Sequence, residues 1–369
     1  MRIAVDAREL QGRATGVGTF LGGILNEWAT MPAAAAHHII LCAPSRVDSP
    51  LVDDRSMSSL WADGHGTWWE QRALPALIRQ AGADVLFAPG YTAPLLSPVP
   101  VVVAIHDVSF AAHPEWFGWR EGLRRRLLTR LAAKRAACVV TISEFSKREI
   151  AAHLGIAPAK ISVVYPAAAR RGTVAPPEPS SPERSRNLVL FAGSLFNRRH
   201  IPELIEAFGK LAHRLPDAKL EIVGDNRTRP RIDFEPLVAA SGAGARISMR
   251  SYLPEAELAA LYRRAGAFVF LSEYEGFGLT PLEALDSGVP IVVLDTAVAR
   301  EVYGSAALYV ERAEPTLVEA GLRRVLTDDA ERTRILDAAP GTLARYSWRT
   351  CAERILALLV SHSACRASR

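Results

Sequence analysis

The chain has 369 residues, of which 49% are hydrophobic and 22% charged, and its formal net charge is +5. This length exceeds what one hydrophobic core usually serves, so two domains are expected, and the composition is typical of a soluble globular protein and does not favour disorder. The positive charge is compatible with an anionic ligand, a nucleic acid or a lipid surface, and does not distinguish among them.

Cysteine spacing and apolar runs indicate the cellular compartment. Cys42, Cys138, Cys351 and Cys365 are far apart and form no C-x-x-C pair. This spacing argues against a zinc cluster or a disulfide framework and favours a reducing cytosol. The first residues contain no signal-peptide apolar region, and no run approaches the roughly 18 apolar residues of a spanning helix. A cytoplasmic protein is expected, and a peripheral contact with the inner face of the membrane remains open.

The first half of the chain alternates short Val- and Ile-rich runs with segments of helical spacing. Buried strands are predicted at residues 2–6, 38–42, 84–88, 99–106, 138–143 and 161–164. Strand–helix alternation of this kind indicates a parallel sheet covered by helices on both faces.

A proline- and serine-rich stretch, residues 170–187, is too poor in apolar residues to join a core. After it, strands are predicted at 188–192, 219–223, 247–251, 267–271 and 290–294, and helices at 201–215, 255–265 and 280–287. The fold class is therefore α/β, with two Rossmann-like, doubly wound domains at 1–172 and 187–346. Residues 173–186 would link them, and a last helix within 347–369 would pack back across the first domain.

Glycines follow predicted strands in both halves of the chain. Gly16 and Gly18 come after the first strand, and Gly193 and Gly224 follow strands of the second half. Ligands of such sheets bind at the carboxyl ends of the strands, so a binding cleft between the two domains is predicted. None of these turns contains a full G-x-G-x-x-G, and tight turns need glycine in any case.

The segment from Glu275 to Glu283 combines two carboxylates, a glycine loop and the start of a helix. Thr280 and Glu283 fit a capping box and Pro281 suits the first helical position, so a helix is predicted to begin at Thr280. Its unpaired N–H groups would face the glycine loop, where a phosphate could approach closely. In the plainer reading, Glu283 is only a helix cap and Glu275 only a loop acid.

Taken together, these motifs resemble the family-four retaining glycosyltransferases with the GT-B fold, in particular mannosyltransferase-like members. The similarity covers nearly the whole chain. It is carried by Asp6-Ala7-Arg8, Thr15-Gly16-Val17-Gly18, Trp69-Glu70-Gln71, Ile105-His106-Asp107, Ser143-Glu144-Phe145-Ser146, Gly193 through His200, Val223-Gly224 and the Glu275–Glu283 segment followed by Gly288-Val289-Pro290.

The resemblance implies a nucleotide-diphosphate sugar as donor substrate. It implies that Glu275 hydrogen-bonds the transferred sugar and that Glu283 holds the ribose hydroxyls. The backbone N–H groups that would meet the diphosphate are those of Phe277, Gly278, Leu279 and Thr280.

In the first domain, the resemblance implies that Gly16 and Gly18 close over the phosphates and that His106 lies near the reacting sugar. Two other interpretations of His106 remain open. It could be a hydrogen-bonded histidine at a strand end, or it could join Asp107 and His113 as a metal ligand, although no further ligand has suitable spacing.

The chain departs from the family pattern between Ser194 and His200. Relatives commonly place Arg or Ser and then Arg-Lys-Asn, whereas this chain has Ser194 and then Arg198, Arg199 and His200. Arg199 keeps the charge of the usual lysine in a planar, forked group. We expect Arg199, together with Arg198, to neutralise the leaving diphosphate, and Ser194 to contact the donor. Asn226 follows another strand and either reaches the nucleotide or lies in a solvated loop.

The segment from Trp116 to Arg135 predicts a basic amphipathic helix. Trp119, Leu123, Leu127 and Leu131 recur at helical spacing, among seven Lys and Arg side chains and one glutamate. This pattern is typical of a helix that contacts an anionic membrane surface. A core-packed helix with a solvated basic face explains it equally well, whereas no base-reading motif supports a nucleic-acid partner.

The sequence thus predicts a retaining hexosyltransferase that moves a sugar to a saccharide or lipid-linked saccharide. GDP-mannose is the first donor to test, because of the similarity to mannosyltransferases. No Asp-x-Asp occurs in the chain, so neither a metal nor another cofactor is expected. A nucleotide-sugar epimerase, a phosphorylase and a non-catalytic nucleotide-sugar-binding protein are the alternatives.

Overall fold

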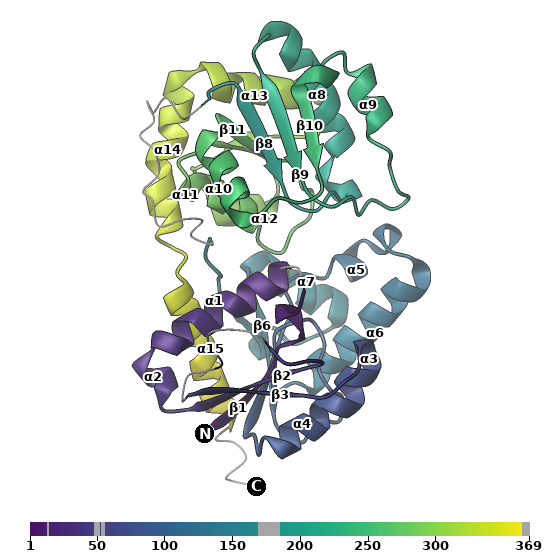
Figure 1. Cartoon of the computed structure of the whole chain (residues 1–369), viewed down its shortest axis with the longest axis vertical. Helices are drawn as coiled ribbons and strands as arrows, with labels where there is room; N and C mark the ends of the chain where they lie inside the picture. The colour runs from purple at the N-terminus through teal and green to yellow at the C-terminus, as the bar shows by residue number, and fades with distance from the viewer. Residues whose placement is uncertain (13–14, 48–51, 53–55, 169–184, 364–369) are drawn as a thin grey trace. The chain divides into compact units, whose positions relative to one another are not determined.

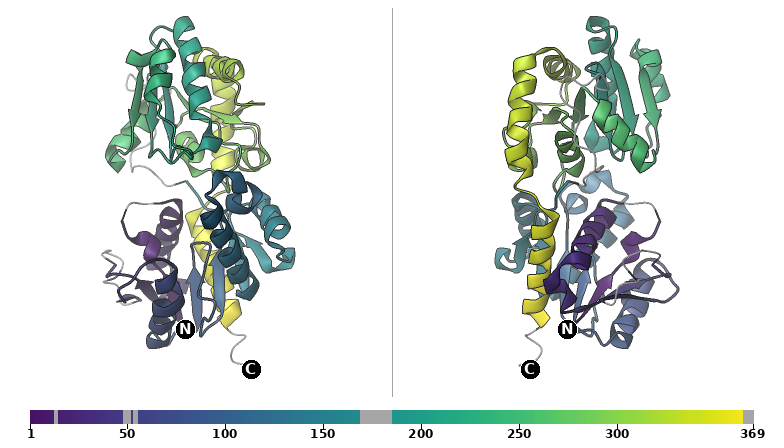
Figure 2. Two further views of the ribbon diagram at one scale, coloured as in Figure 1. Left: turned by 90° about the vertical axis from the view of Figure 1, so that its right-hand side faces the viewer. Right: turned by 60° about the vertical axis from the view of Figure 1, so that its left-hand side comes forward.

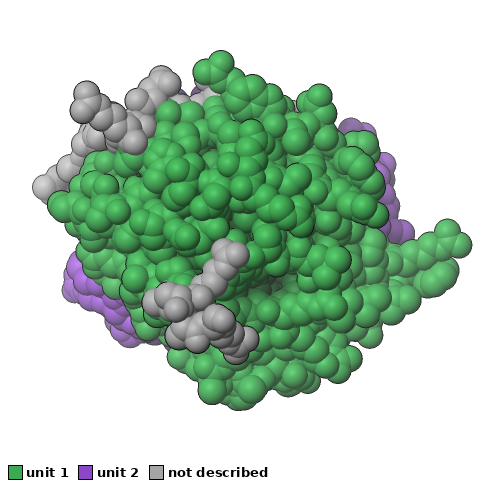
Figure 3. All heavy atoms as spheres, turned by 90° about the horizontal axis from the view of Figure 1, so that it is seen from below, with its two compact units in different colours: residues 1–166, 346–369 green, residues 167–345 purple. Residues whose placement is uncertain are grey.

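The computed structural model describes residues 1–12, 15–47, 52, 56–168 and 185–363. The chain divides into two compact units, which are coloured separately in Figure 3. Unit 1 contains Met1–Pro166 and Tyr346–Arg369, and unit 2 contains Ala167–Arg345. Most of the predicted linker, residues 173–186, lies outside the described residues.

Unit 1 is built on a seven-stranded parallel sheet with strand order β3-β2-β1-β4-β5-β6-β7. The strands are β1 (Arg2–Asp6), β2 (His38–Ala43), β3 (Met57–Trp61), β4 (Val85–Ala88), β5 (Val101–Ala104), β6 (Cys138–Thr141) and β7 (Ile161–Val163). Six of them were predicted to within a few residues. The edge strand β3 was missed, because it is only partly buried and lacks a continuous apolar run.

Helices cover both faces of this sheet. They are α1 (Gly16–Thr30), α2 (Pro32–Ala35), α3 (Gly66–Trp68), α4 (Leu74–Gln80), α5 (Ser109–Ala112), α6 (Trp119–Arg135), α7 (Glu144–Leu154) and α15 (Trp348–Ser363). Shorter helical turns are η1 (Arg8–Leu10), η3 (Trp69–Ala73), η4 (Pro114–Trp116) and η5 (Pro158–Lys160). None of the described helices combines the length and hydrophobicity needed to cross a bilayer.

The last helix, α15, runs beside α1 on one face of the unit 1 sheet (Figures 1 and 2). Trp28 of α1 donates its indole N–H to the carbonyl oxygen of Ala352 at 3.0 Å. The Trp348 ring packs so tightly on Gly23 that a Cβ there would lie 2.5 Å from a ring carbon. The chain therefore returns to the first domain at its C-terminal helix, as the sequence predicts.

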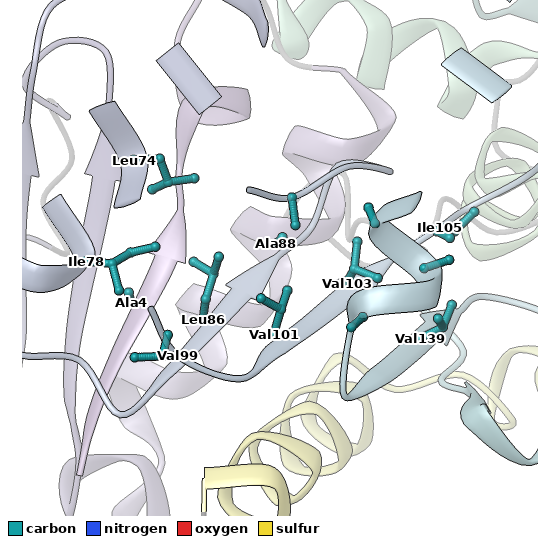
Figure 4. Close-up of a cluster of buried hydrophobic side chains, with 14 of the residues drawn as sticks. Ala4, Leu74, Ile78, Leu86, Ala88, Val99, Val101, Val103, Ile105 and Val139 are labelled. Atoms are coloured by element: carbon teal, nitrogen blue, oxygen red, sulfur yellow. The ribbon is translucent and has the colours of Figure 1, made fainter. Parts of the chain in front are cut away.

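The opposite face of the sheet carries a second layer of buried side chains. Phe87 lies near Trp28 of α1, whereas its neighbour Leu86 points the other way, because successive strand residues face opposite sides. Leu74 and Ile78 of α4 lie in the same buried cluster as Leu86, and Figure 4 shows these side chains. Both faces are dry, which explains the unbroken apolar runs of β4 and β5.

Unit 2 repeats this plan with a six-stranded parallel sheet in the order β10-β9-β8-β11-β12-β13. Its strands are β8 (Leu188–Ala192), β9 (Lys219–Val223), β10 (Ile247–Arg250), β11 (Ala267–Phe270), β12 (Ile291–Leu294) and β13 (Leu308–Val310). Its helices are α8 (Ile201–Arg214), α9 (Glu235–Ala240), α10 (Glu255–Arg264), α11 (Leu279–Asp286), α12 (Ala297–Tyr303), α13 (Pro315–Thr327) and α14 (Asp329–Leu343). The predicted elements are present, whereas α9, β13 and α12 to α14 were not foreseen.

Candidate functional site

In unit 2, two glycine turns follow the central strands β8 and β9. Gly193 and Gly224 have φ angles of +139° and +158°, which side chains rarely adopt. A Cβ on Gly193 would lie 2.6 Å from Nη1 of Arg199, and one on Gly224 would overlap the carbonyl oxygen of Gly193. Gly193 therefore leaves room for the Arg199 guanidinium, and Gly224 lets the two strand-end turns approach closely.

Arg199 and Glu275, which are 76 residues apart in the sequence, form an ion pair in this space. Arg199 lies in the short helical turn η6 (Asn197–Arg199), and its Nε and Nη2 donate to Oε1 of Glu275 at 3.0 and 2.8 Å. Its Nη1 donates to the carbonyl oxygen of Ser194 at 2.8 Å. The side chains of Arg199 and Glu275 are only 12% and 17% exposed. Ser194 is one of the residues predicted to contact the donor. In the structure, its main-chain carbonyl oxygen holds the Arg199 side chain.

The hydrogen bonds of the Glu275 carboxylate converge on one oxygen. Ser272 Oγ also donates to Oε1, at 2.8 Å, so three donors from two side chains meet there. Among the described residues, the contacts of Glu275 leave Oε2 with acceptor capacity for a further donor. A carboxylate held this way has one oxygen fixed and one ready to bind a hydroxyl group.

Positive charge gathers around Arg199. Arg198 lies over the Phe196 ring, 4.4 Å from its centroid, and its Nε donates to the carbonyl oxygen of Tyr274 at 3.1 Å. Burial lowers the pKa of Arg199 while Glu275 opposes that effect, and the group stays cationic because a guanidinium ordinarily titrates far above neutral pH. These two arginines make this edge of unit 2 a candidate anion site.

His200 adds a third basic group and has an unusual backbone. It adopts the left-handed conformation with φ +52°, and its ring nitrogens lie 3.3 Å from Glu203 and 3.4 Å from Glu273. Burial lowers the pKa of His200, but these two carboxylates outweigh it, and the net shift is upward. His200 thus ties the segment after β8 to the segment after β11.

The helix of the Glu275–Glu283 segment begins one residue earlier than predicted. Leu279 is the first residue of α11, and Gly278 precedes it with φ +91° and no side-chain cap. Tyr303 Oη donates to the carbonyl oxygen of Gly278 at 2.9 Å, and a Cβ on Gly278 would overlap that hydroxyl. Gly278, which has a left-handed backbone and accepts a hydrogen bond from Tyr303, therefore takes the N-cap position that was predicted for Thr280.

The predicted capping box is accordingly wrong. Thr280 is the second helical residue and Pro281 the third, and Glu283 turns inward, where Oε2 accepts from Tyr262 Oη at 3.3 Å. Glu283 is only 2% exposed. Since no side chain caps the first turn, the N–H groups at the start of α11 can bind an anion.

A cavity of about 470 Å³ lies at the carboxyl ends of β9 and β10 in unit 2. Its walls include Gly224, Asn226, Met249 and Arg250. The Asn226 amide is used within its own loop, since Nδ2 donates to the carbonyl oxygen of Ile232 at 2.8 Å and Oδ1 accepts from Thr228. Asn226 therefore shapes the cavity wall, and its direct contact with a nucleotide stays a prediction.

In unit 1, Gly16 and Gly18 form the first turn of α1, whereas the sequence predicted a glycine loop. Thr15 caps this helix because its Oγ1 accepts from the Gly18 N–H at 3.0 Å and donates to Glu9 at 3.0 Å. A Cβ on Gly18 would lie 2.6 Å from the Glu9 carbonyl oxygen. Gly18 is therefore required for close packing of α1 against η1, whereas a Cβ on Gly16 would meet nothing within 4 Å.

His106 follows β5 and is buried among aromatic rings. Its Nε2 donates to the carbonyl oxygen of Pro89 at 2.7 Å, and its ring meets Phe20 and Tyr91 edge-on. Burial lowers the pKa of His106, so the ring is neutral at pH 7. This geometry agrees with the interpretation of His106 as a hydrogen-bonded histidine at the end of a strand. In the part of the chain that the structure describes, no three His, Cys, Asp or Glu side chains are grouped to hold a metal ion.

Sequence reasoning missed two other features of unit 1. Tyr91 has φ +67°, a strained conformation for a bulky residue, and its Oη donates to Asp107 at 2.9 Å. Arg8 donates to Asp6 at 2.6 Å and to Glu70 at 2.8 Å, and both carboxylates are buried. The second network could have been suspected, because its residues lie in two of the stretches that carry the family resemblance.

Two family patterns match the chain. "Glycosyltransferase Family 4" covers residues 16–168, and "Glycosyl transferases group 1" covers residues 177–341. The O-antigen chain mannosyltransferase RfbU of Salmonella typhimurium is 26% identical over 253 residues, which is 69% of this chain and 68% of that protein. A D-inositol 3-phosphate glycosyltransferase of Corynebacterium urealyticum is 29% identical over 185 residues, 47% of this chain and only 43% of that protein.

Solved structures agree on the fold. Anabaena Alr3699/HepE in complex with UDP-glucose superimposes with a TM-score of 0.76 at 17% identity, covering 98% of this chain and 100% of the other. WaaG, a glycosyltransferase involved in lipopolysaccharide biosynthesis, gives 0.71 at 17% identity, covering 97% and 99%. The two parallel-sheet units have the GT-B fold, and the chain belongs to the family-four glycosyltransferases.

Proposed function

We propose that this glycosyltransferase moves a sugar from a nucleotide-diphosphate donor to a saccharide or lipid-linked saccharide, with retention of anomeric configuration and without a metal ion. The observation that carries the proposal is the Arg199–Glu275 pair beside the Gly193 turn. In one place it supplies a cation for phosphate and a carboxylate for hydroxyl groups.

The positively charged groups of unit 2 would bind the diphosphate of the donor. Cleavage of the bond between the anomeric carbon and the diphosphate oxygen leaves negative charge on the phosphate, which needs fixed donors. Arg199, Arg198 and the N–H groups of Phe277, Gly278, Leu279 and Thr280 are the candidates in unit 2. The acceptor oxygen bonds to the anomeric carbon, and its proton passes to the departing phosphate oxygen. No protein base and no metal is then required.

The sugar and the ribose would each meet a carboxylate. Oε2 of Glu275 would accept a hydrogen bond from a sugar hydroxyl while Oε1 stays with Arg199 and Ser272. Glu283 is assigned to the ribose hydroxyls from the family resemblance, with Tyr262 holding Oε2. In unit 1, Gly16 and Gly18 would lie by the phosphates and neutral His106 by the sugar.

The donor proposal begins with GDP-mannose because the Salmonella relative is named a mannosyltransferase. The Anabaena structure is in complex with UDP-glucose, so UDP-sugars belong in the same panel. We would measure donor binding by calorimetry and transfer to saccharide and lipid-linked acceptors, each with and without EDTA. Retention would be read from the anomeric coupling in the NMR spectrum of the product.

The outcomes separate the alternatives. Formation of a glycoside that persists in EDTA supports the proposal, whereas loss of activity in EDTA contradicts the metal-independent step. Conversion of the donor without an acceptor indicates an epimerase, and a requirement for inorganic phosphate indicates a phosphorylase. Tight binding without product across the acceptor panel indicates a sensor of nucleotide sugars. No binding of any donor overturns the proposal.

A further inference from the structure

Helix α6 in unit 1 exposes its large apolar side chains. Trp119, Leu123 and Leu127, one helical turn apart, are 73%, 56% and 54% exposed. The buried positions of α6 are instead the small residues Gly122, Thr129, Ala132 and Ala133. The core-packed interpretation is therefore wrong for these three side chains, because the helix packs on the sheet through a different, smaller face.

Two hydrogen bonds extend the exposed apolar surface beyond α6. Arg124 donates to Thr67 Oγ1 at 2.9 Å, which places α3 and its 66% exposed Trp68 next to α6 (Figure 1). Arg135 donates to the carbonyl oxygen of Leu95 at 3.2 Å, beside Leu96, which is 78% exposed. We call Trp119, Leu123 and Leu127 the α6 face, and Trp68 and Leu96 are exposed apolar side chains on segments that are hydrogen-bonded to α6.

Basic side chains surround this surface. α6 carries seven of them and one acid, Glu121, which pairs with Arg125 at 2.8 Å. The basic residues are Arg120, Arg124, Arg125, Arg126, Arg130, Lys134 and Arg135. The Arg120 guanidinium lies 5.0 Å from the Trp119 ring centroid, so charge and apolar surface are in direct contact.

We propose that the α6 face binds the surface of an anionic lipid bilayer. Trp119, Leu123 and Leu127 would enter the boundary between headgroups and acyl chains, while the arginines contact lipid phosphates. Trp favours that boundary because its ring is apolar and its N–H polar. A second copy of this chain is disfavoured as the occupant, because it would bring two clusters of arginines together.

Flotation of the full chain with vesicles tests this proposal without a donor or acceptor, so the result is independent of the proposed function. We expect binding to vesicles of phosphatidylcholine with phosphatidylglycerol, little binding to phosphatidylcholine alone, and weakening as salt is raised. The triple variant Trp119→Ser/Leu123→Ser/Leu127→Ser should weaken binding at least about tenfold. The three replaced side chains are exposed, so the triple variant should stay folded, and circular dichroism would verify this.

Matched substitutions separate insertion from adsorption. Arg120→Glu with Arg130→Glu should also weaken binding about tenfold, whereas Lys210→Glu with Arg312→Glu in unit 2 should leave it unchanged. Leu237→Ser with Val360→Ser is the apolar control. Failure to float with anionic vesicles at low salt overturns the proposal. So does full binding by the folded triple variant, which would indicate adsorption by charge alone, and so does equal loss in either control.

Discussion

The two units differ in the charge that they place at the same architectural position. Each has a parallel sheet with polar groups at the carboxyl ends of its central strands and a helix that begins beside them. In unit 2 that edge carries Arg198, Arg199 and His200, together with the uncapped start of α11. In unit 1 the corresponding cation, Arg8, forms ion pairs with Asp6 and Glu70, and His106 is neutral.

We propose that this difference divides two tasks between two units of the same fold plan. An anion such as a diphosphate gains most where guanidinium groups are shared with few carboxylates, as in unit 2. A neutral saccharide with many hydroxyl groups suits an edge of neutral or paired groups, as in unit 1. Fold alone does not decide the ligand, since both edges have the same topology.

The sharpest test of this comparison replaces one arginine in each unit. Arg199→Met should lower turnover by roughly 100- to 1,000-fold, because a donor to the leaving phosphate is lost. Arg8→Met should instead destabilise unit 1 by about 3–5 kcal/mol, because two buried carboxylates lose their partner. Transfer kinetics and thermal unfolding measured on both variants would distinguish these effects.

Arg199→Lys is the matched control, since it keeps the charge and restores the lysine of relatives. It should retain more activity than Arg199→Met by at least about tenfold. If instead Arg8→Met impaired donor binding at temperatures where it stays folded, the proposed division between the units would be wrong.

Glu275→Gln should reduce kcat/KM by about 100-fold, because the amide is a poorer acceptor for a sugar hydroxyl and leaves Arg199 without its counter-charge. Steady-state transfer assays measure this loss. The control is Glu273→Gln, two residues earlier, whose half-exposed carboxylate contacts His200 and should matter little. Equal losses in the two variants would mean that activity depends on the negative charge of the whole segment and not on the Glu275 carboxylate itself.

Gly278→Ala should weaken donor binding by about tenfold, because alanine at φ +91° is strained and its Cβ meets Tyr303 Oη. Calorimetry with the donor would measure the change. Tyr303→Phe should cost a smaller part of the same affinity, since it removes the hydrogen bond to Gly278. Gly341→Ala is the control, because a Cβ there meets nothing within 4 Å and the position is helical. An unchanged affinity in Gly278→Ala would exclude the α11 start as a phosphate site.

The two site histidines should affect stability in opposite directions with pH. His106 has a lowered pKa when folded, so its contribution is complete above about pH 6.5 and is lost as the pH falls toward the folded pKa. His200 has a raised pKa, so its contribution is complete below about pH 6.5 and is lost as the pH rises through the folded pKa. Imidazole NMR titrations would give both directions.

The variants His106→Gln and His200→Asn would assign the signals in these titrations. Each should remove one imidazole signal and one branch of the pH dependence of stability. Shifts of the same sign in both histidines would contradict the electrostatic contrast between the units.

The sequence by itself determined most of the strands and the alternation that produces two parallel sheets. These follow from local patterns, since buried parallel strands require unbroken apolar runs. It also pointed to Arg199 and Glu275 separately.

Only the tertiary structure decided how distant groups meet. Arg199 and Glu275 are joined across 76 residues, and Tyr303 of α12 fixes Gly278 so that α11 starts before Thr280. In α6, the periodic Trp and Leu residues face outward because small residues pack more closely on the sheet. Periodicity shows that a helix has an apolar stripe, but the neighbouring elements decide which of its faces is buried.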